Sequence, residues 1–345
     1  MVHYYARRSV AALLRVLPPR LNYFARNLLE KATFRKVSQV HDLPPIFHYW
    51  SNRYLRPRFE TLGFSSPDDF FAKSIAREME RLARPLNALS LGSGNCDLEI
   101  RIVKALREQN LVGFRITCLD LNETMLARGR AQAQSEGLSD CMAFERGDIN
   151  RLDIARHFDV VIANQCLHHF VELEAIFANI ARIVEPQGLF LTSDMIGRNG
   201  HQLWPEALAE VERFWNVLPE RYKFDHVLRR QCHSYVNYNH ADVAFEGVRA
   251  QDILSLLVQL FQFDLFVPYA CIAPPIVGRR FGWNFDVNNR DDLALIDQIA
   301  VRDEDLIATG VVKPTQLIAA MRVAGVSNAV WLGNRSPEQS VRETS

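Results

Sequence analysis

Short apolar runs alternate with longer amphipathic stretches through the middle of the chain. Five runs predict strands, at residues 88–91, 115–119, 142–145, 158–163 and 188–192. Helical periodicity separates them, most clearly over residues 97–108 and 172–184. This alternation is typical of βαβ units, which build a parallel sheet. Residues 262–267 and 315–323 supply a sixth and a seventh strand, so we predict an α/β fold with a mostly parallel, seven-stranded sheet.

The same pattern divides the chain into four regions. Residues 1–85 are predicted to be a helical N-terminal extension or lid, in which Ser66 and Pro67, followed by two acids, indicate a helix start. Residues 86–195 are the βαβ core. We expect residues 196–330 to provide inserted substrate-pocket elements and the last strands of the same sheet, and residues 331–345 to be a flexible tail.

Composition narrows the class of protein. The chain has 345 residues, 48% of them hydrophobic, which is enough for a substantial core. Its formal net charge is zero and the core has no basic stripe, so we expect no nucleic-acid partner. The six cysteines are scattered, with no pair at zinc-ligand spacing, so neither a disulfide framework nor a structural metal is predicted and a reducing compartment, the cytoplasm, is favoured.

Basic residues are concentrated before residue 40, around the apolar stretch 10–16. One interpretation is an amphipathic helix lying on an anionic membrane. The other, which we favour because Pro18 and Pro19 cut the segment into short helices, is packing against the catalytic domain. Elsewhere no apolar segment approaches the roughly 20 residues that span a bilayer, and no secretory leader is evident.

A glycine pair marks the candidate ligand site. Gly92 and Gly94 follow the first strand and open a helix, where glycine lets a backbone approach a ligand closely. Asp120 ends the second strand, so its carboxylate can accept the ribose hydroxyls of an adenosine. A dinucleotide fingerprint would need a third glycine at Asp97, where an anion repels a pyrophosphate. A positively charged sulfonium nucleoside fits better than NAD.

With these parts in order, residues 86–195 resemble the catalytic core of class I S-adenosylmethionine-dependent methyltransferases. The family's first motif corresponds to residues 90–96, its ribose-binding acid to Asp120 and its adenine-contacting acid to Asp148. Its fourth-strand motif corresponds to residues 158–164. The resemblance implies a Rossmann-like, doubly wound fold and S-adenosyl-L-methionine as the cofactor. The family often has an acid at the position of Ser90 and a glycine at that of Cys96.

The resemblance also implies which side chains contact the cofactor. The first motif supplies the glycine turn and its neighbours, the acids supply contacts to ribose and adenine, and the end of the fourth strand faces the cofactor or the acceptor. The predicted cofactor-binding residues are Leu91, Gly92, Ser93, Gly94, Asn95, Asp120, Leu121, Met125, Asp148, Ile149, Asn164 and Gln165.

Acid–base candidates follow the fourth and fifth strands. His168 and His169 come directly after the fourth strand, and either is a candidate general base because histidine titrates near neutrality. Asp194 and His201 follow the fifth strand as further catalytic candidates. Each of the four also has a plain interpretation as a capping, packing or loop residue. Because a sulfonium is already a good leaving group, alignment and desolvation of the acceptor can supply most of the effect.

We expect the methyl acceptor to be bound by regions of the chain that contain no recognisable motif. Aromatic and basic side chains gather near residues 48–54 and 232–240, which makes these segments candidate acceptor walls. Helix packing explains the first segment equally well, and no motif assigns a role to the second. The predicted substrate-binding residues are Tyr49, Arg53, Tyr54, His169, Tyr235 and Tyr238. We therefore expect methyl transfer to a small molecule at O, N, S or C. The alternatives are an NAD-dependent oxidoreductase and an inactive cofactor-binding relative; the oligomeric state stays open.

Overall fold

The computed structural model describes residues 42–149, 154–242, 245–324 and 329–342. The basic N-terminal segment lies outside these residues. The chain divides into two compact units. The sheet unit contains Phe59–Ile196, Gln251–Pro268 and the residues from Leu317 onward, and the helical unit contains the described residues up to Arg58 together with Gly197–Ala250 and Tyr269–Gln316.

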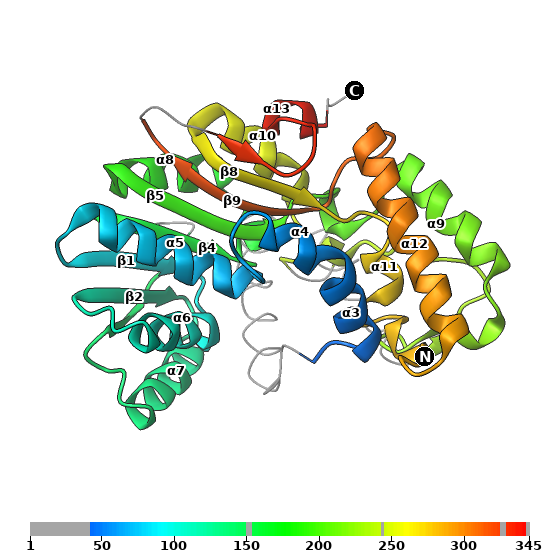
Figure 1. The fold of residues 1–345 in the computed structure, drawn as a ribbon, viewed down its shortest axis with the longest axis horizontal. Coiled ribbons are helices and arrows are strands. Elements are labelled where there is room, and N and C mark those ends of the chain that lie inside the picture. Colours follow the sequence, from blue (N-terminus) through cyan, green and yellow to red (C-terminus); the bar gives the residue numbers. More distant parts are fainter. Residues whose placement is uncertain (1–41, 150–153, 243–244, 325–328, 343–345) are drawn as a thin grey trace. The chain divides into compact units, whose positions relative to one another are not determined.

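An eight-stranded sheet forms the centre of the sheet unit, in the order β10-β8-β9-β5-β4-β1-β2-β3 (Figure 1). The strands are β1 (Leu86–Leu91), β2 (Phe114–Asp120), β3 (Met142–Arg146), β4 (Phe158–Asn164), β5 (Val184–Met195), β8 (Gln262–Tyr269), β9 (Gln316–Arg322) and β10 (Val330–Trp331). β1 pairs in parallel with both β2 and β4, which places their carboxyl ends at one edge. The predicted α/β fold with a mostly parallel sheet is confirmed.

The predicted number of strands, seven, is wrong by one. β10 adds an eighth strand because Val330 and Trp331 pair in parallel with Leu265 and Phe266 of β8. Two residues are too few to show a strand periodicity, so no hydrophobic pattern predicts this strand. The segment predicted to be a flexible tail also holds α13 (Pro337–Ser340), where Ser336 and Gln339 form a capping box.

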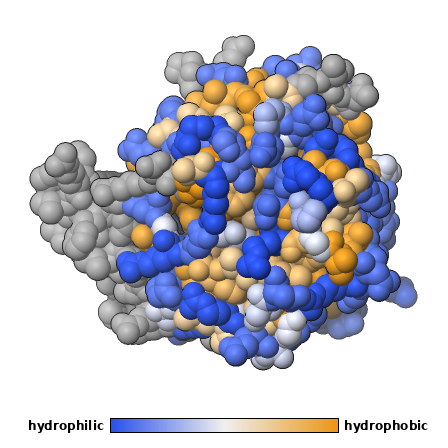
Figure 2. Space-filling model, turned by 90° about the vertical axis from the view of Figure 1, so that its left-hand side faces the viewer, coloured by the Kyte–Doolittle hydropathy of each residue, from blue (hydrophilic) through white to orange (hydrophobic). Residues whose placement is uncertain are grey.

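Helices cover both faces of the sheet. They are α5 (Pro67–Leu82), α6 (Asp97–Glu108), α7 (Glu123–Ser135), α8 (Leu173–Ile183) and α10 (Ala250–Leu260), with a 3-10 turn, η3 (Leu167–His169). The predicted start of α5 is confirmed, since the Ser66 hydroxyl accepts a hydrogen bond from the backbone N–H of Asp69 at 3.2 Å. Figure 2 shows the face on the left-hand side of Figure 1, where hydrophilic residues and hydrophobic patches are interspersed.

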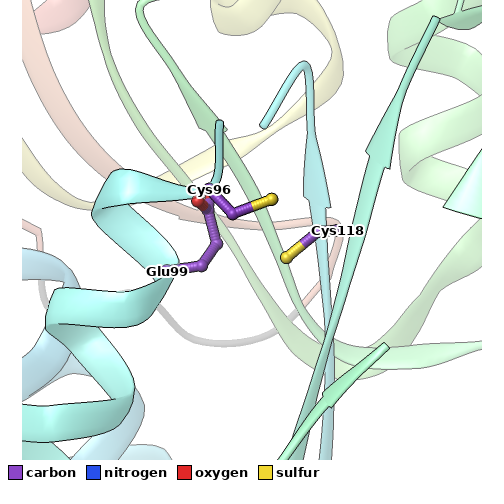
Figure 3. A group of neighbouring side chains, drawn as sticks. All are labelled: Cys96, Glu99 and Cys118. Carbon is purple, nitrogen blue, oxygen red and sulfur yellow. The ribbon is translucent and has the colours of Figure 1, made fainter. Parts of the chain in front are cut away.

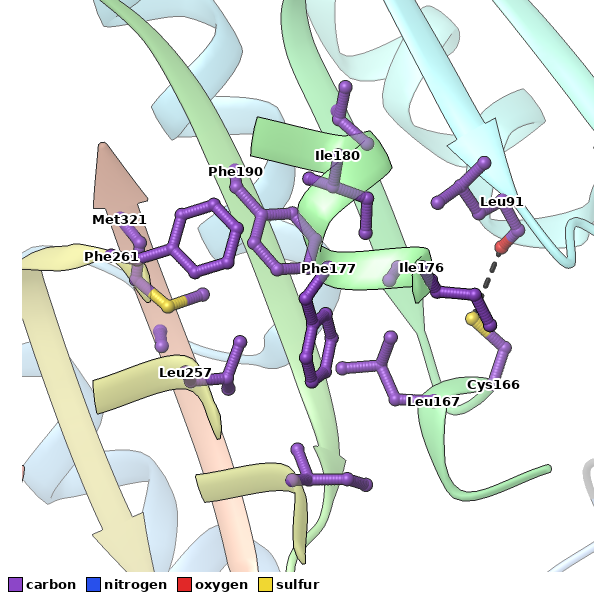
Figure 4. Packing of buried hydrophobic residues seen from close by; sticks show 14 of the residues in the cluster. Leu91, Cys166, Leu167, Ile176, Phe177, Ile180, Phe190, Leu257, Phe261 and Met321 are labelled. Carbon is purple, nitrogen blue, oxygen red and sulfur yellow. Dashed lines mark hydrogen bonds between the residues drawn. The ribbon is translucent and has the colours of Figure 1, made fainter. Parts of the chain in front are cut away.

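The apolar core of the sheet unit lies between the sheet and α8 with α10. Phe177 of α8, Phe190 of β5 and Phe261 meet there (Figure 4), with the Phe190 and Phe261 ring centroids 5.2 Å apart. Leu89 and Leu91 of β1 belong to the same cluster. Because side chains alternate along a strand, Ser90 points to the opposite face, toward α6. One face of the sheet at β1 therefore carries the apolar core, whereas the other carries the polar side chain of Ser90.

The helical unit is built from helices and short turns. It contains α3 (Pro45–Trp50), the π-helix η1 (Ser51–Leu55), α9 (Pro205–Val217), α11 (Pro274–Val277) and α12 (Arg290–Thr309), while α4 (Arg56–Glu60) crosses into the sheet unit. The 3-10 turns are η4 (Asn199–His201), η5 (Glu220–Tyr222), η6 (His240–Asp242) and η7 (Gly282–Asn284). A two-stranded antiparallel sheet, β6 (Phe224–Asp225) with β7 (Arg230–Gln231), completes it. No helix among the described residues is long and apolar enough to cross a membrane.

A buried carboxylate organises the helical unit. Asp303 of α12 is 3% exposed, and its two oxygens accept hydrogen bonds from the backbone N–H groups of Cys271, Ile272 and Ala273 at 2.9–3.2 Å. Burial raises the pKa of Asp303 to about 6, although these donors oppose the shift. The turn before α11 therefore depends on one acidic side chain of α12.

We expect Asp303→Ala to lower the free energy of unfolding by about 3 kcal/mol or more, because it leaves three buried N–H groups without an acceptor. Asp305→Ala is the matched control on the same helix, since the Asp305 side chain is 55% exposed and pairs with Arg302. The control should cost less than about 1 kcal/mol. Urea unfolding of both variants measures the difference, and equal losses would contradict this role of Asp303.

Candidate functional site

The loop between β1 and α6 is held in a strained, left-handed conformation. Gly92, Gly94 and Cys96 have φ angles of 63°, 55° and 61°, all in the left-handed region that favours glycine, so Cys96 carries the strain. The backbone N–H of Gly92 donates to the carbonyl of Leu119 at 2.8 Å, which ties the loop to the end of β2. The loop therefore presents its backbone at the carboxyl edge of the sheet, where open α/β folds bind ligands.

Gly92 also lies against the turn that follows β4. A Cβ atom at Gly92 would stand 2.8 Å from Cβ of Cys166, which is closer than real Cβ contacts come. The Cys166 thiol in turn donates to the carbonyl oxygen of Leu91 at 3.2 Å. Two segments far apart in sequence thus meet at this edge with no room for a larger residue.

Asp120 joins the loop to the end of β2. One carboxylate oxygen accepts the backbone N–H of Gly94 at 2.9 Å and the other accepts that of Asn122 at 2.7 Å. Burial raises the pKa of Asp120, although both N–H donors oppose the shift. Each oxygen still has a lone pair for a ribose hydroxyl, so the carboxylate fits a nucleoside.

The remaining predicted cofactor residues surround the loop. Met125 lies in the first turn of α7, and its Cε would be 3.1 Å from a Cβ at Gly94. Ile149 is buried, with Cδ1 3.8 Å from a Cβ at Gly92, and Asp148 precedes it. The side-chain oxygen of Asn95 is buried and finds no hydrogen-bond partner among the described residues, which suits an ammonium donor such as that of a bound amino acid. These features fit S-adenosylmethionine.

A buried aspartate shapes the turn after β4. One oxygen of Asp194 accepts the backbone N–H groups of Cys166 and Leu167, each at 2.8 Å, and the other lies 2.5 Å from Nδ1 of His168. Gln165 has a positive φ of 49°, and its backbone N–H donates to the carbonyl of Ser193. The segment from Asn164 to His168 is thus fixed to the end of β5.

Asp194 stays ionised in spite of its burial. Desolvation opposes the charged form, but the charge of His168, its hydrogen bond and backbone N–H groups hold the pKa of Asp194 below its usual value. An ionised carboxylate on Nδ1 fixes the orientation and tautomer of the imidazole. Asp194 therefore holds the His168 ring in place, while a catalytic role for either residue stays a prediction. His169 follows in the same turn, with its ring centroid 4.2 Å from that of His168.

The other predicted site residues belong to the helical unit. The Tyr49 hydroxyl donates to Asp297 at 2.8 Å, and Nε of Arg53 lies 3.3 Å from the same carboxylate. Burial and this contact raise the pKa of Tyr49 to about 12. The guanidinium of Arg53 also lies over the ring of Tyr54, 5.8 Å from its centroid. These side chains are organised around Asp297, a residue that the sequence did not single out.

Tyr235, Tyr238 and His201 lie elsewhere in the helical unit. Burial raises the pKa of Tyr235 to about 12, and its ring packs edge-on against Trp215. Tyr238 packs edge-on against His240, with ring centroids 4.9 Å apart. Nε2 of His201 lies 3.2 Å from Glu246. A catalytic or substrate-binding role for each of these residues stays a prediction.

Comparison with known proteins finds a family model that matches the middle of the chain. The model of a methyltransferase domain matches residues 89–192, which include the glycine loop, Asp120 and most of β5. Residues 89–192 are therefore similar to methyltransferase domains. The predicted family and its cofactor, S-adenosylmethionine, are thereby confirmed.

The chain matches only part of the length of its curated relatives. A sterol 24-C-methyltransferase of Gibberella zeae is 31% identical over 127 residues, which are 35% of this chain and 32% of that enzyme. A demethylmenaquinone methyltransferase of Leptospira interrogans is 26% identical over 180 residues, 51% of this chain and 64% of that enzyme. A solved structure titled as a sarcosine dimethylglycine methyltransferase from Galdieria sulphuraria has a TM-score of 0.45 at 14% identity, covering 76% of this chain and 86% of that one.

The contacts of two buried acids in the sheet unit were not predicted from the sequence. Glu99 is 2% exposed, and its carboxylate accepts a 2.5 Å hydrogen bond from the Ser90 hydroxyl, so an acid reaches Ser90 from the helix instead of the strand. Asp194 was singled out for chemistry, but its hold on the turn at Cys166 and Leu167 was not foreseen. A lone acid within the apolar face of residues 98–103 was the available signal for Glu99.

We expect Gly92→Ala to be much more damaging than Gly137→Ala. Both glycines have a positive φ, 63° and 68°, which costs an alanine about 1–2 kcal/mol. Nothing lies within 4 Å of a Cβ at Gly137, whereas one at Gly92 meets Cys166. The collision should cost a further 1–3 kcal/mol or so in urea unfolding. Equal stability of the two variants would show that Gly92 is not packed as described.

Proposed function

We propose that the chain is an S-adenosylmethionine-dependent methyltransferase that acts on a small-molecule acceptor. The observation that carries the proposal is the loop at Gly92 and Gly94 bonded to Asp120 within the methyltransferase domain. That arrangement suits a nucleoside without a phosphate, and Asp97 at the start of α6 disfavours the pyrophosphate of NAD. The cofactor supplies an activated methyl group, and the chain supplies binding and alignment.

The catalytic role of the chain's own residues follows from the turn after β4. We assign His168 as the candidate base, oriented by Asp194 through the 2.5 Å contact at Nδ1. His169 is the next candidate, because it shares the turn, while His201 belongs to the helical unit. Asn164 and Gln165 are assigned to the cofactor or the acceptor, since they end β4 at the edge that carries the glycine loop.

The names of the relatives favour an apolar acceptor. The curated proteins that share this domain methylate a sterol carbon or demethylmenaquinone. We propose Tyr49, Arg53, Tyr54, Tyr235 and Tyr238 as acceptor-binding side chains of the helical unit. A cytoplasmic location is part of the proposal and rests on the scattered cysteines of the sequence.

A methyl-transfer screen tests the proposed activity. The chain is incubated with S-adenosylmethionine carrying a labelled methyl group and with sterols, quinones and, as polar comparators, small amines. Mass spectrometry then detects both the methylated product and S-adenosylhomocysteine. Labelled product from at least one small molecule is expected. Binding of the cofactor without transfer to any member of the panel would favour the inactive relative.

Asp120→Ala should weaken binding of S-adenosylhomocysteine by at least about tenfold, because each hydrogen bond to a charged group contributes about 1.5–3 kcal/mol. Asp140→Ala is the control, since Asp140 is an exposed acid paired with Arg107. Calorimetry with S-adenosylhomocysteine and with NAD gives both affinities. Tight NAD binding, or an Asp120→Ala affinity equal to that of the control, would overturn the assignment of the ribose site.

His168→Asn should lower kcat by roughly 10²–10⁴-fold if His168 is the base, and it should remove one limb of the pH–rate profile. The acceptor found in the screen serves as substrate. His157→Asn, which changes an exposed histidine before β4, should leave the profile unchanged. A His168→Asn enzyme with a lower unfolding midpoint but an unaltered pH profile would assign His168 to structure alone.

A further inference from the structure

A second cluster of reactive side chains lies on the other face of the sheet. Ser90 of β1 and Cys118 of β2 are paired neighbours in the sheet, so their side chains point to the same face. Cys96 and Glu99 approach them from the start of α6 (Figure 3). One ligand atom from each of Cys96, Glu99 and Cys118 lies within 4.8 Å of the other two. The fold thus brings the Cys118 thiol of β2 to a thiol and a carboxylate at the start of α6.

The cluster is buried, and one of its polar atoms has no hydrogen-bond partner among the described residues. Cys96 and Cys118 are fully buried, and Glu99 is 2% exposed. One carboxylate oxygen of Glu99 accepts the Ser90 hydroxyl, but the other is buried and finds no partner within the part of the chain that the structure describes. Leaving a buried polar group unsatisfied is costly, so such a group calls for an explanation. A cation bound beside the thiols would supply the missing partner.

We propose that Cys96, Cys118 and Glu99 bind a thiophilic divalent cation of the Zn²⁺ type. Cysteine thiolates and glutamate carboxylates are both ligands that Zn²⁺ takes in proteins. Ligand sulfurs around a tetrahedral zinc stand about 3.8 Å apart, so the 4.8 Å limit here requires only a small closure. Binding displaces both thiol protons and any proton on Glu99. The hydrogen bond from the Ser90 hydroxyl holds the Glu99 carboxylate in place.

The proposed ion would tie the cofactor loop to the sheet. Cys96 ends that loop and precedes α6, whereas Cys118 lies in β2, two residues before Asp120. A metal bridge between them would fix the loop conformation next to the ribose-binding acid. Gly129 of α7 packs directly against Cys96, because a Cβ there would stand 2.8 Å from Sγ of Cys96. By linkage, metal affinity and cofactor affinity would then depend on each other.

Cadmium titration of the full chain tests the proposal, because cadmium thiolates have an ultraviolet charge-transfer band. The protein is kept reduced with a phosphine and free of other metals. The wild type should bind one Cd²⁺ per chain with the thiolate band, and Zn²⁺ should displace it. Cys96→Ala and Cys118→Ala should lose the band. Cys141→Ala, which removes another buried thiol, should keep it.

Two further variants keep both thiols and guard against misfolding. Glu99→Gln should weaken Cd²⁺ affinity at least about tenfold, and Ser90→Ala, which removes only the support of the carboxylate, by roughly 10–100-fold. Circular dichroism confirms that each variant is folded. The proposal is overturned if the wild type shows no thiolate band, or if Cys96→Ala and Cys118→Ala bind Cd²⁺ as Cys141→Ala does. A Cys96–Cys118 disulfide in place of metal binding, detected by counting the thiols of denatured protein before the phosphine is added, would also overturn it.

Discussion

The hydrogen bonds of one buried carboxylate, Asp194, hold the cofactor edge of the sheet together. They join the end of β5 to the turn after β4, and that turn carries Cys166 against Gly92. The conformation of the glycine loop therefore depends on a residue about a hundred positions further along the chain. An ionised aspartate can act in this way because three backbone N–H groups and His168 compensate for its lost hydration.

Asp120 performs the complementary task on the other side of the loop. It accepts an N–H from Gly94 and another from Asn122, so the carboxylate that would bind ribose also fixes the loop beside it. Binding and positioning are thus carried by the same group. Such a site is organised before the ligand arrives, which lowers the ordering cost of binding. It also means that stability and affinity must be measured together when this residue is changed.

The sequence predicted what depends on local pattern. β1, β2 and β4 were located to within two residues, and α6 was located at its observed bounds, because strand and helix periodicities are strong there. The glycine pair and Asp120 stood out because special backbone angles and strand-end acids leave a recognisable trace. The role of Glu99 and the hold of Asp194 on the turn could not be derived, since each depends on a pairing between residues that only the fold brings together.

The contacts within the helical unit were even harder to predict from the sequence, for a physical reason. Two acids of α12 organise this unit: the partly exposed Asp297 beside Tyr49, and the buried Asp303 at the turn before α11. A lone aspartate in a helix is most often solvated, so nothing in the sequence distinguishes one that accepts several buried N–H groups. Cofactor binding requires one backbone geometry and leaves a motif, whereas an acceptor pocket can be lined by many combinations of side chains. The sequence therefore predicts the cofactor but not the methyl acceptor.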